Sequence, residues 1–154
     1  MTRVVVETGT RWVFASALDW PGWSRRGRGE DAALETLQAY AARYRTIAEG
    51  AGLGSCPEEL EVVARSGAGT IVDFGAPGGP SPWDTRSWPA EEAALHVTLL
   101  RASWDAFDAG AAGAPLDNGA PLAAVAAWPG SYFVRRATWH VTDHLWEIED
   151  RATA

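Results

Sequence analysis

The C-terminal segment constrains the fold most strongly, because it predicts one long amphipathic helix over residues 132–150. Residues four apart on a helix lie about one turn from each other, so His140 and His144 project from the same face. Trp139 and Trp146 are seven apart and form a stripe beside this histidine face. The back half of the chain is therefore expected to be helical.

The first half of the chain predicts strands instead. Residues 3–7 and 12–18 have the pattern of two strands, joined by a hairpin turn at residues 8–11. Pro21 has no amide hydrogen and Gly22 favours a turn, so the second strand must end before them.

A basic stretch separates these strands from the first helix. Acidic residues begin that helix at position 30, and it ends at Gly50 or Gly52. Residues 60–64 and 70–74 predict a second pair of strands. The basic stretch contains Arg25, Arg26 and Arg28.

Residues 76–88 are rich in glycine, proline and serine and predict a linker. The linker separates a ββαββ segment over residues 1–75 from a helical segment over residues 89–154, and we expect the two to pack as one compact unit. A first C-terminal helix is expected over residues 89–108, and residues 109–127 predict a loop. The expected fold class is α+β: a small antiparallel sheet with one packed helix, followed by two long helices.

Charge and cysteine content exclude several classes of function. A net charge of -7 disfavours a nucleic-acid partner, and the absence of lysine excludes Schiff-base lysines and P-loop lysines. No apolar run is long enough to span a membrane, and residues 1–10 lack the pattern of a signal peptide. The single cysteine, Cys56, fits a reducing compartment. We therefore expect a cytoplasmic protein with neither a nucleic-acid nor a membrane partner.

The histidines form the first candidate site. His140 and His144 are close enough to share a metal ion, and Glu147, one turn further along, could be a third ligand or a catalytic base. His96 lies on the other predicted C-terminal helix and could complete a three-histidine site for zinc, nickel or iron(II). Histidines one turn apart also occur on ordinary helices without a metal. The neighbouring acids are expected to form a solvated face or to pair with nearby arginines. These acids are Asp143, Glu149 and Asp150, and the arginines are Arg135, Arg136 and Arg151.

Nine tryptophans are the second unusual feature of the sequence. Indole rings in loops and along helices either cover a core or line an apolar cleft. We predict a pocket for a small-molecule substrate with five of these rings in its walls, and ordinary core packing is the alternative for any single ring. The five are Trp20, Trp23, Trp104, Trp139 and Trp146.

The first part of the chain resembles a known small domain. The segment VFASALDWPGW over residues 13–23, followed by Gly27 and a helix that begins EDAAL at residues 30–34, is similar to the front of the HicB-like α/β domain. In antitoxins this module blocks a partner toxin. The resemblance therefore implies an interaction module.

The last helix resembles a second family. The segment RRATWHVTDH over residues 135–144, continued by WEIEDR over residues 146–151, is similar to the last helix of actinobacterial DinB-like proteins. The resemblance implies a helical bundle that binds a divalent metal through three histidines, two of which match His140 and His144. It also implies thiol-dependent transferase or isomerase chemistry with mycothiol as a cofactor.

The chain departs from the DinB-like pattern at the third histidine. In that family this ligand comes from a middle helix, for which residues 109–128 are too short and too broken. His96 would lie on an earlier helix, so the chain resembles a shortened member of the family.

Three functions remain open from the sequence. The first is a DinB-like enzyme that acts on a small molecule with a divalent metal. The second is a metal-free cyclase or isomerase, or a binding or resistance protein for an apolar ligand, that uses the same tryptophan-lined cleft. The third is a HicB-like antitoxin module. A homodimer is an open alternative in each case.

Overall fold

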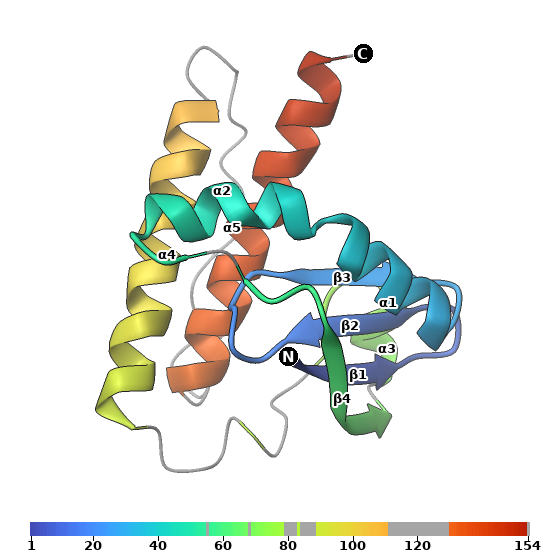
Figure 1. The fold of residues 1–154 in the computed structure, drawn as a ribbon. Helices are drawn as coiled ribbons and strands as arrows, with labels where there is room; N and C mark the ends of the chain where they lie inside the picture. The colour runs from blue at the N-terminus through green and yellow to red at the C-terminus, as the bar shows by residue number, and fades with distance from the viewer. Residues whose placement is uncertain (55, 68, 79–82, 84–88, 111–129, 154) are drawn as a thin grey trace.

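The computed structural model describes residues 1–154 except 55, 68, 79–82, 84–88, 111–129 and 154. It contains a four-stranded mixed sheet and two long C-terminal helices, which confirms the α+β class (Figure 1). The predicted linker at residues 76–88 and the predicted loop at residues 109–127 lie largely outside the described residues.

The four strands form a sheet in the order β3-β2-β1-β4. Strands β1 (Thr2–Thr8) and β2 (Val13–Ala17) form the predicted hairpin, and β3 (Ser24–Gly27) pairs with β2 antiparallel. Strand β4 (Leu60–Gly67) pairs with β1 in parallel, so the prediction of an antiparallel sheet is wrong for this strand. Parallel strands require a long crossover connection, which the helices between β3 and β4 provide.

This crossover contains two helices where the sequence predicted one. Helix α1 (Glu30–Ala39) and helix α2 (Ala41–Gly50) meet at Tyr40, whose φ of -89° and ψ of 1° interrupt the helical geometry. Gly52, with a φ of 72°, follows the end of α2. The bend at Tyr40 lets α1 cover the sheet while α2 reaches the C-terminal helices (Figure 1).

Residues 70–74 do not form the predicted strand, because most of them belong to the short helix α3 (Gly69–Asp73). A short apolar run does not distinguish a strand from a helical turn by periodicity alone. Val72 is buried, and the Asp73 carboxylate accepts hydrogen bonds from the backbone N–H groups of residues 10–12. These contacts fasten α3 to the turn between β1 and β2.

The basic stretch after the hairpin forms β3, an edge strand that the sequence analysis did not predict. A Cβ atom at Gly27 would lie 2.3 Å from the backbone of α1, so only glycine allows the helix to follow the strand this closely. Arg25 pairs with Ala15 and Arg26 pairs with Phe14 across the ladder. The two arginines therefore leave the strand on opposite faces of the sheet.

Both faces of the sheet are covered by apolar side chains. Val4 and Val6 of β1 belong to the main core, together with Leu37 of α1. A smaller cluster on the other face joins the sheet to α3 and to the last helix. It consists of Phe14, Val72 and Trp139.

The two predicted C-terminal helices are confirmed as α4 (Ala90–Gly110) and α5 (Gly130–Ala152), which pack side by side. Leu99 of α4 and Leu145 of α5 belong to the main core, so both helices pack against the sheet half of the chain. None of the helices in the described part of the chain is long and apolar enough to cross a membrane.

Candidate functional site

His140 and His144 lie on a solvent-exposed face of α5, with ring centroids 4.5 Å apart and ring planes at 86°. His144 Nδ1 is 3.5 Å from Glu147 Oε2, and the Arg151 guanidinium donates to the Glu147 carboxylate at 2.6 Å. Burial, together with the charges of His144 and Arg136, lowers the pKa of His140 below its ordinary value. The structure thus brings the two histidines and Glu147 together on one open helix face.

His96 lies elsewhere, on the buried side of α4, and is 4% exposed. Burial acts to raise the pKa of Asp19, but hydrogen bonds from Arg3 and the charges of Arg3 and His96 hold it below its ordinary value. In the described part of the chain, no three His, Cys, Asp or Glu side chains are placed to hold a metal ion. The predicted three-histidine set is not assembled, because His96 faces the interior while the α5 pair faces solvent.

Two of the five predicted pocket tryptophans pack around Tyr44 instead. Trp23 is fully buried, stacks on Tyr44 at 5.7 Å between ring centroids, and donates its Nε1–H to the Leu37 carbonyl at 2.8 Å. Trp20 meets the same tyrosine edge-on at 6.3 Å. Both rings therefore stabilise the core beneath α1 and α2.

Two further tryptophans lie on the C-terminal helices and do not line the pocket described below. Trp146 of α5 is 1% exposed and packs on Tyr40 at 4.9 Å between ring centroids. Trp104 of α4 is 48% exposed and meets Phe107 edge-on at 5.9 Å. These four rings are buried against different elements or face solvent, so the structure does not bring them together with Trp139 around the pocket described next.

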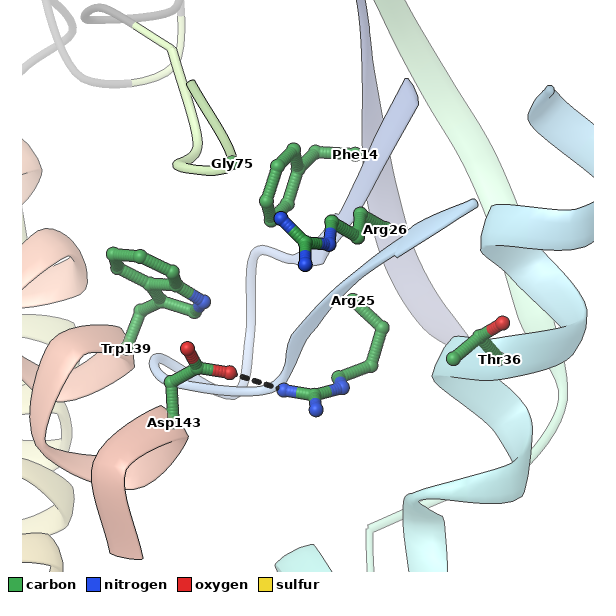
Figure 2. Close-up of a pocket in the computed structure, with 7 residues that line it drawn as sticks. All are labelled: Phe14, Arg25, Arg26, Thr36, Gly75, Trp139 and Asp143. Carbon is green, nitrogen blue, oxygen red and sulfur yellow. Dashed lines mark hydrogen bonds and ion pairs between the residues drawn. The ribbon is translucent and has the colours of Figure 1, made fainter. Parts of the chain in front are cut away.

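A pocket of about 270 Å³ lies where the edge strand β3 faces α5 (Figure 2). Thr36 of α1 and Gly75, in the turn that follows α3, complete its walls. Of the five predicted tryptophans, Trp139 lines it. The lining residues are Phe14, Arg25, Arg26, Thr36, Gly75, Trp139 and Asp143.

Trp139 supplies a buried hydrogen-bond donor to this pocket. It is 7% exposed and meets Phe14 edge-on at 6.2 Å between ring centroids. Its indole Nε1–H has no hydrogen-bond acceptor among the described residues. Figure 2 shows this nitrogen directed toward the space in front of Arg25 and Arg26. A buried donor without a partner costs about 1–3 kcal/mol, which an acceptor on a bound ligand would regain.

Arg25 is held rigidly at one wall of the pocket. Its Nη1 donates to Asp143 Oδ1 at 2.5 Å, and its guanidinium carbon lies 4.0 Å from the centroid of Tyr40 and 4.9 Å from that of Trp146. The Arg25 side chain is 16% exposed. Its charge is compensated by Asp143, so the pair joins β3 to α5 and closes this wall.

Arg26 contributes a positive charge and forms no ion pair with a carboxylate of the described residues. Its guanidinium carbon lies 4.8 Å from the centroid of Trp12, and that of Arg28 lies 4.2 Å from the same ring. Gly75 has a φ of 94°, and a Cβ atom there would lie 2.3 Å from Arg26 Nη1. Because Gly75 has no side chain, the Arg26 guanidinium has space to extend to the pocket.

The sequence analysis missed the polar part of this pocket. It treated Arg25 and Arg26 only as a basic stretch, and it predicted a solvated face or a nearby arginine for Asp143. The structure pairs Asp143 with Arg25, 118 residues away along the chain. The available signal was the pair of consecutive arginines at positions 25 and 26. The structure buries their two neighbours, Ser24 and Gly27, in β3 and leaves Arg26 exposed.

Comparison with protein-family models, curated proteins and solved structures returns no match for this chain. The DinB-like and HicB-like resemblances therefore remain predictions from the sequence.

Proposed function

We propose that this chain binds a small organic molecule in the pocket between β3 and α5. The observation that carries this proposal is the buried, unpartnered Nε1–H of Trp139 in the wall of that cavity. This is the metal-free binding protein among the three functions that the sequence left open. The lining is more polar than the apolar cleft expected for it.

The chemistry of the lining supports binding rather than catalysis. The Asp143 carboxylate accepts from Arg25, and the Thr36 hydroxyl donates to the Ala32 carbonyl at 2.7 Å. Both hydrogen bonds are made within the fold, one to a compensating arginine and one to a helix carbonyl, and neither activates a nucleophile or a general base. The lining therefore offers groups that hold a ligand.

The volume of the pocket indicates the size of the ligand. An engineered cavity of about 150 Å³ holds one benzene molecule. A pocket of about 270 Å³ therefore has room for a single ring with short substituents.

The proposal is tested by NMR of the indole N–H signals during titration with a panel of single-ring acids, amides and amines at millimolar concentration. The Trp139 signal is assigned by its loss in the Trp139→Phe variant. We expect at least one compound to shift this signal while the signal of Trp104, exposed on α4, stays in place. If no compound of any charge shifts the Trp139 signal, the proposal is wrong.

A second candidate is the DinB-like metal enzyme, with mycothiol as its cofactor. The 4.5 Å separation of the His140 and His144 rings favours it. The described residues add only Glu147, which already pairs with Arg151, so they do not fit the three-ligand set of a catalytic zinc site. Metal analysis of protein purified without a nickel column tests this candidate. Stoichiometric metal that is lost in His144→Ala would favour it over the binding protein.

The remaining predictions belong with these proposals. A cytoplasmic location and the absence of a nucleic-acid partner follow from the charge and the single cysteine. The HicB-like interaction module rests on residues 13–34 alone.

A further inference from the structure

We infer that the ligand of this pocket is a single-ring carboxylic acid, whose carboxylate binds between the Arg26 guanidinium and the Trp139 Nε1–H. This inference rests on the proposed function and adds the chemical class of the ligand. It follows from the charge of the pocket, from its excess of donors and from its aromatic walls.

The charge of the pocket is opposite to that of the whole chain. Among the described residues that line the pocket, Arg25 and Arg26 carry two positive charges and Asp143 carries one negative charge, which leaves one positive charge in excess. The whole chain carries a net charge of -7. Asp143 compensates Arg25, so the excess charge belongs to Arg26. A ligand with one negative charge would neutralise the lining.

The hydrogen-bonding groups of the pocket point to the same class. Arg26 offers N–H donors only, and so does the indole of Trp139. The Asp143 carboxylate accepts from Arg25 and is therefore already engaged. A carboxylate matches this set because it accepts hydrogen bonds at both oxygens and fits a guanidinium in its plane.

Arg26 is positioned for this contact before any ligand binds. The Trp12 ring supports its guanidinium from one side, and Gly75 leaves space for Nη1 on the other. A pre-positioned guanidinium loses less side-chain entropy when it binds an anion. The nearby Arg28 lies over the same Trp12 ring but does not line the pocket, so it supplies a matched control.

The aromatic walls favour a ring attached to the carboxylate. Phe14 and Trp139 meet edge-on and both line the cavity. Edge-to-face and offset-stacked arrangements stabilise aromatic groups in such a site. A ring against these walls would place its carboxylate toward Arg26 and the Trp139 nitrogen, the side to which Figure 2 shows that nitrogen directed.

The test uses the full chain and three probes: benzoate, benzamide and inorganic phosphate. Benzamide has the size and shape of benzoate but no charge. We expect benzoate to shift the Trp139 indole signal and to bind about tenfold more tightly than benzamide, with phosphate weaker than benzoate. Added salt should weaken benzoate binding, because the attraction is partly between charges near the surface.

The matched variants are Arg26→Gln and Arg28→Gln, both at exposed positions of the folded protein. We expect Arg26→Gln to weaken benzoate binding about tenfold and to leave benzamide binding unchanged, whereas Arg28→Gln stays within about twofold of the parent protein. Thermal unfolding of both variants checks that they fold.

Each failure has a distinct meaning. Equal binding of benzoate and benzamide, or equal effects of the two arginine variants, would overturn the inference and leave the proposed function standing. If phosphate binds as tightly as benzoate, the ring does not contribute to affinity, and the inference of a single-ring ligand is wrong. If neither aromatic probe binds, and no compound of the wider panel does, the proposed function itself is wrong.

Discussion

Two neighbouring faces of α5 differ in almost every physical respect. One face meets the sheet: Trp139 and Trp146 are buried there, and Asp143, whose side chain is 40% exposed, pairs with Arg25. The other face is open to solvent, and it consists of His140, His144 and Glu147. The open face carries the residue types that are best known for catalysis. The face that meets the sheet carries side chains whose positions are fixed by contacts: Trp139 with Phe14, Trp146 with Tyr40 and Asp143 with Arg25.

This difference shows that residue type and placement are separate kinds of information. The histidine pair belongs to one helix and both residues are exposed, although the surrounding protein partly desolvates the His140 ring. Trp139 is covered by Phe14 from the other half of the chain, and its N–H points into a cavity. A buried donor without a hydrogen-bond acceptor indicates a ligand site more strongly than a pair of exposed histidines does.

The largest expected effect compares Trp146 with His144. Replacing Trp146, which is 1% exposed, by alanine should lower the free energy of unfolding by about 3–5 kcal/mol, because it leaves a large cavity beside Tyr40. His144→Ala on the open face should change it by less than about 0.5 kcal/mol. Urea denaturation measures both. If the two variants lose similar amounts of unfolding free energy, the two faces of α5 do not differ in their contribution to stability.

The next effect concerns Gly75, which lines the pocket beside Arg26. Gly75→Ala should lower the free energy of unfolding by about 1–2 kcal/mol, because φ is 94° there and the new Cβ would collide with Arg26. The same variant should weaken benzoate binding. Gly50→Ala is the control, since nothing lies within 4 Å of a Cβ at the end of α2, and it should be neutral or slightly stabilising. A neutral Gly75→Ala would show that Arg26 is not held as described.

The ion pair between the halves of the chain should contribute less. A double-mutant cycle with Arg25→Gln and Asp143→Asn should give a coupling free energy of about 1 kcal/mol, since Arg25 is mostly buried and Asp143 is partly exposed. The same cycle on the exposed pair Arg45–Glu58 should give less than about 0.5 kcal/mol. Equal coupling free energies in the two cycles would mean that the ion pair of Asp143 with Arg25 is no stronger than an exposed surface pair.

The smallest effect concerns the open face and pH. Because the pKa of His140 is lowered in the folded protein, the unfolded chain binds more protons between that pKa and the ordinary value of 6.5. The stabilisation from the neutral ring is fully present above 6.5 and is lost as the pH falls through the folded pKa. The groups that act on the ring are His144, Arg136 and Asp143.

The measurement is urea denaturation at about pH 5 and about pH 8, together with an NMR titration of the ring. The parent protein should lose more stability on acidification than His140→Gln does. An identical pH dependence in the two proteins would contradict the lowered pKa.

Elements with a clear internal period were predictable. The hairpin of β1 and β2 and both C-terminal helices follow from local patterns of apolar residues. Strand β3 and the parallel pairing of β4 were not predictable in this way. An edge strand that contains Arg25 and Arg26 has little apolar pattern, and the direction of β4 depends on a crossover rather than on its own residues.

The candidate site was less predictable than the fold. Trp139 was among the predicted pocket residues, but Trp23 has the same side chain and lies fully buried beneath α1. Their roles differ because the Trp23 N–H finds the Leu37 carbonyl, whereas that of Trp139 faces a cavity. Such hydrogen bonds join residues that are far apart in the chain, and no local pattern encodes them.

The sequence by itself determined that α5 is amphipathic and that His140 and His144 share one of its faces, because helical geometry sets the angle between residues four apart. Only the tertiary structure decided which face of α5 meets β3, that Asp143 pairs with Arg25, and that His96 is turned into the interior. The physical reason is that periodicity sets positions around one helix axis. The partner that covers each position depends on how the sheet, α1 and α4 pack around that helix.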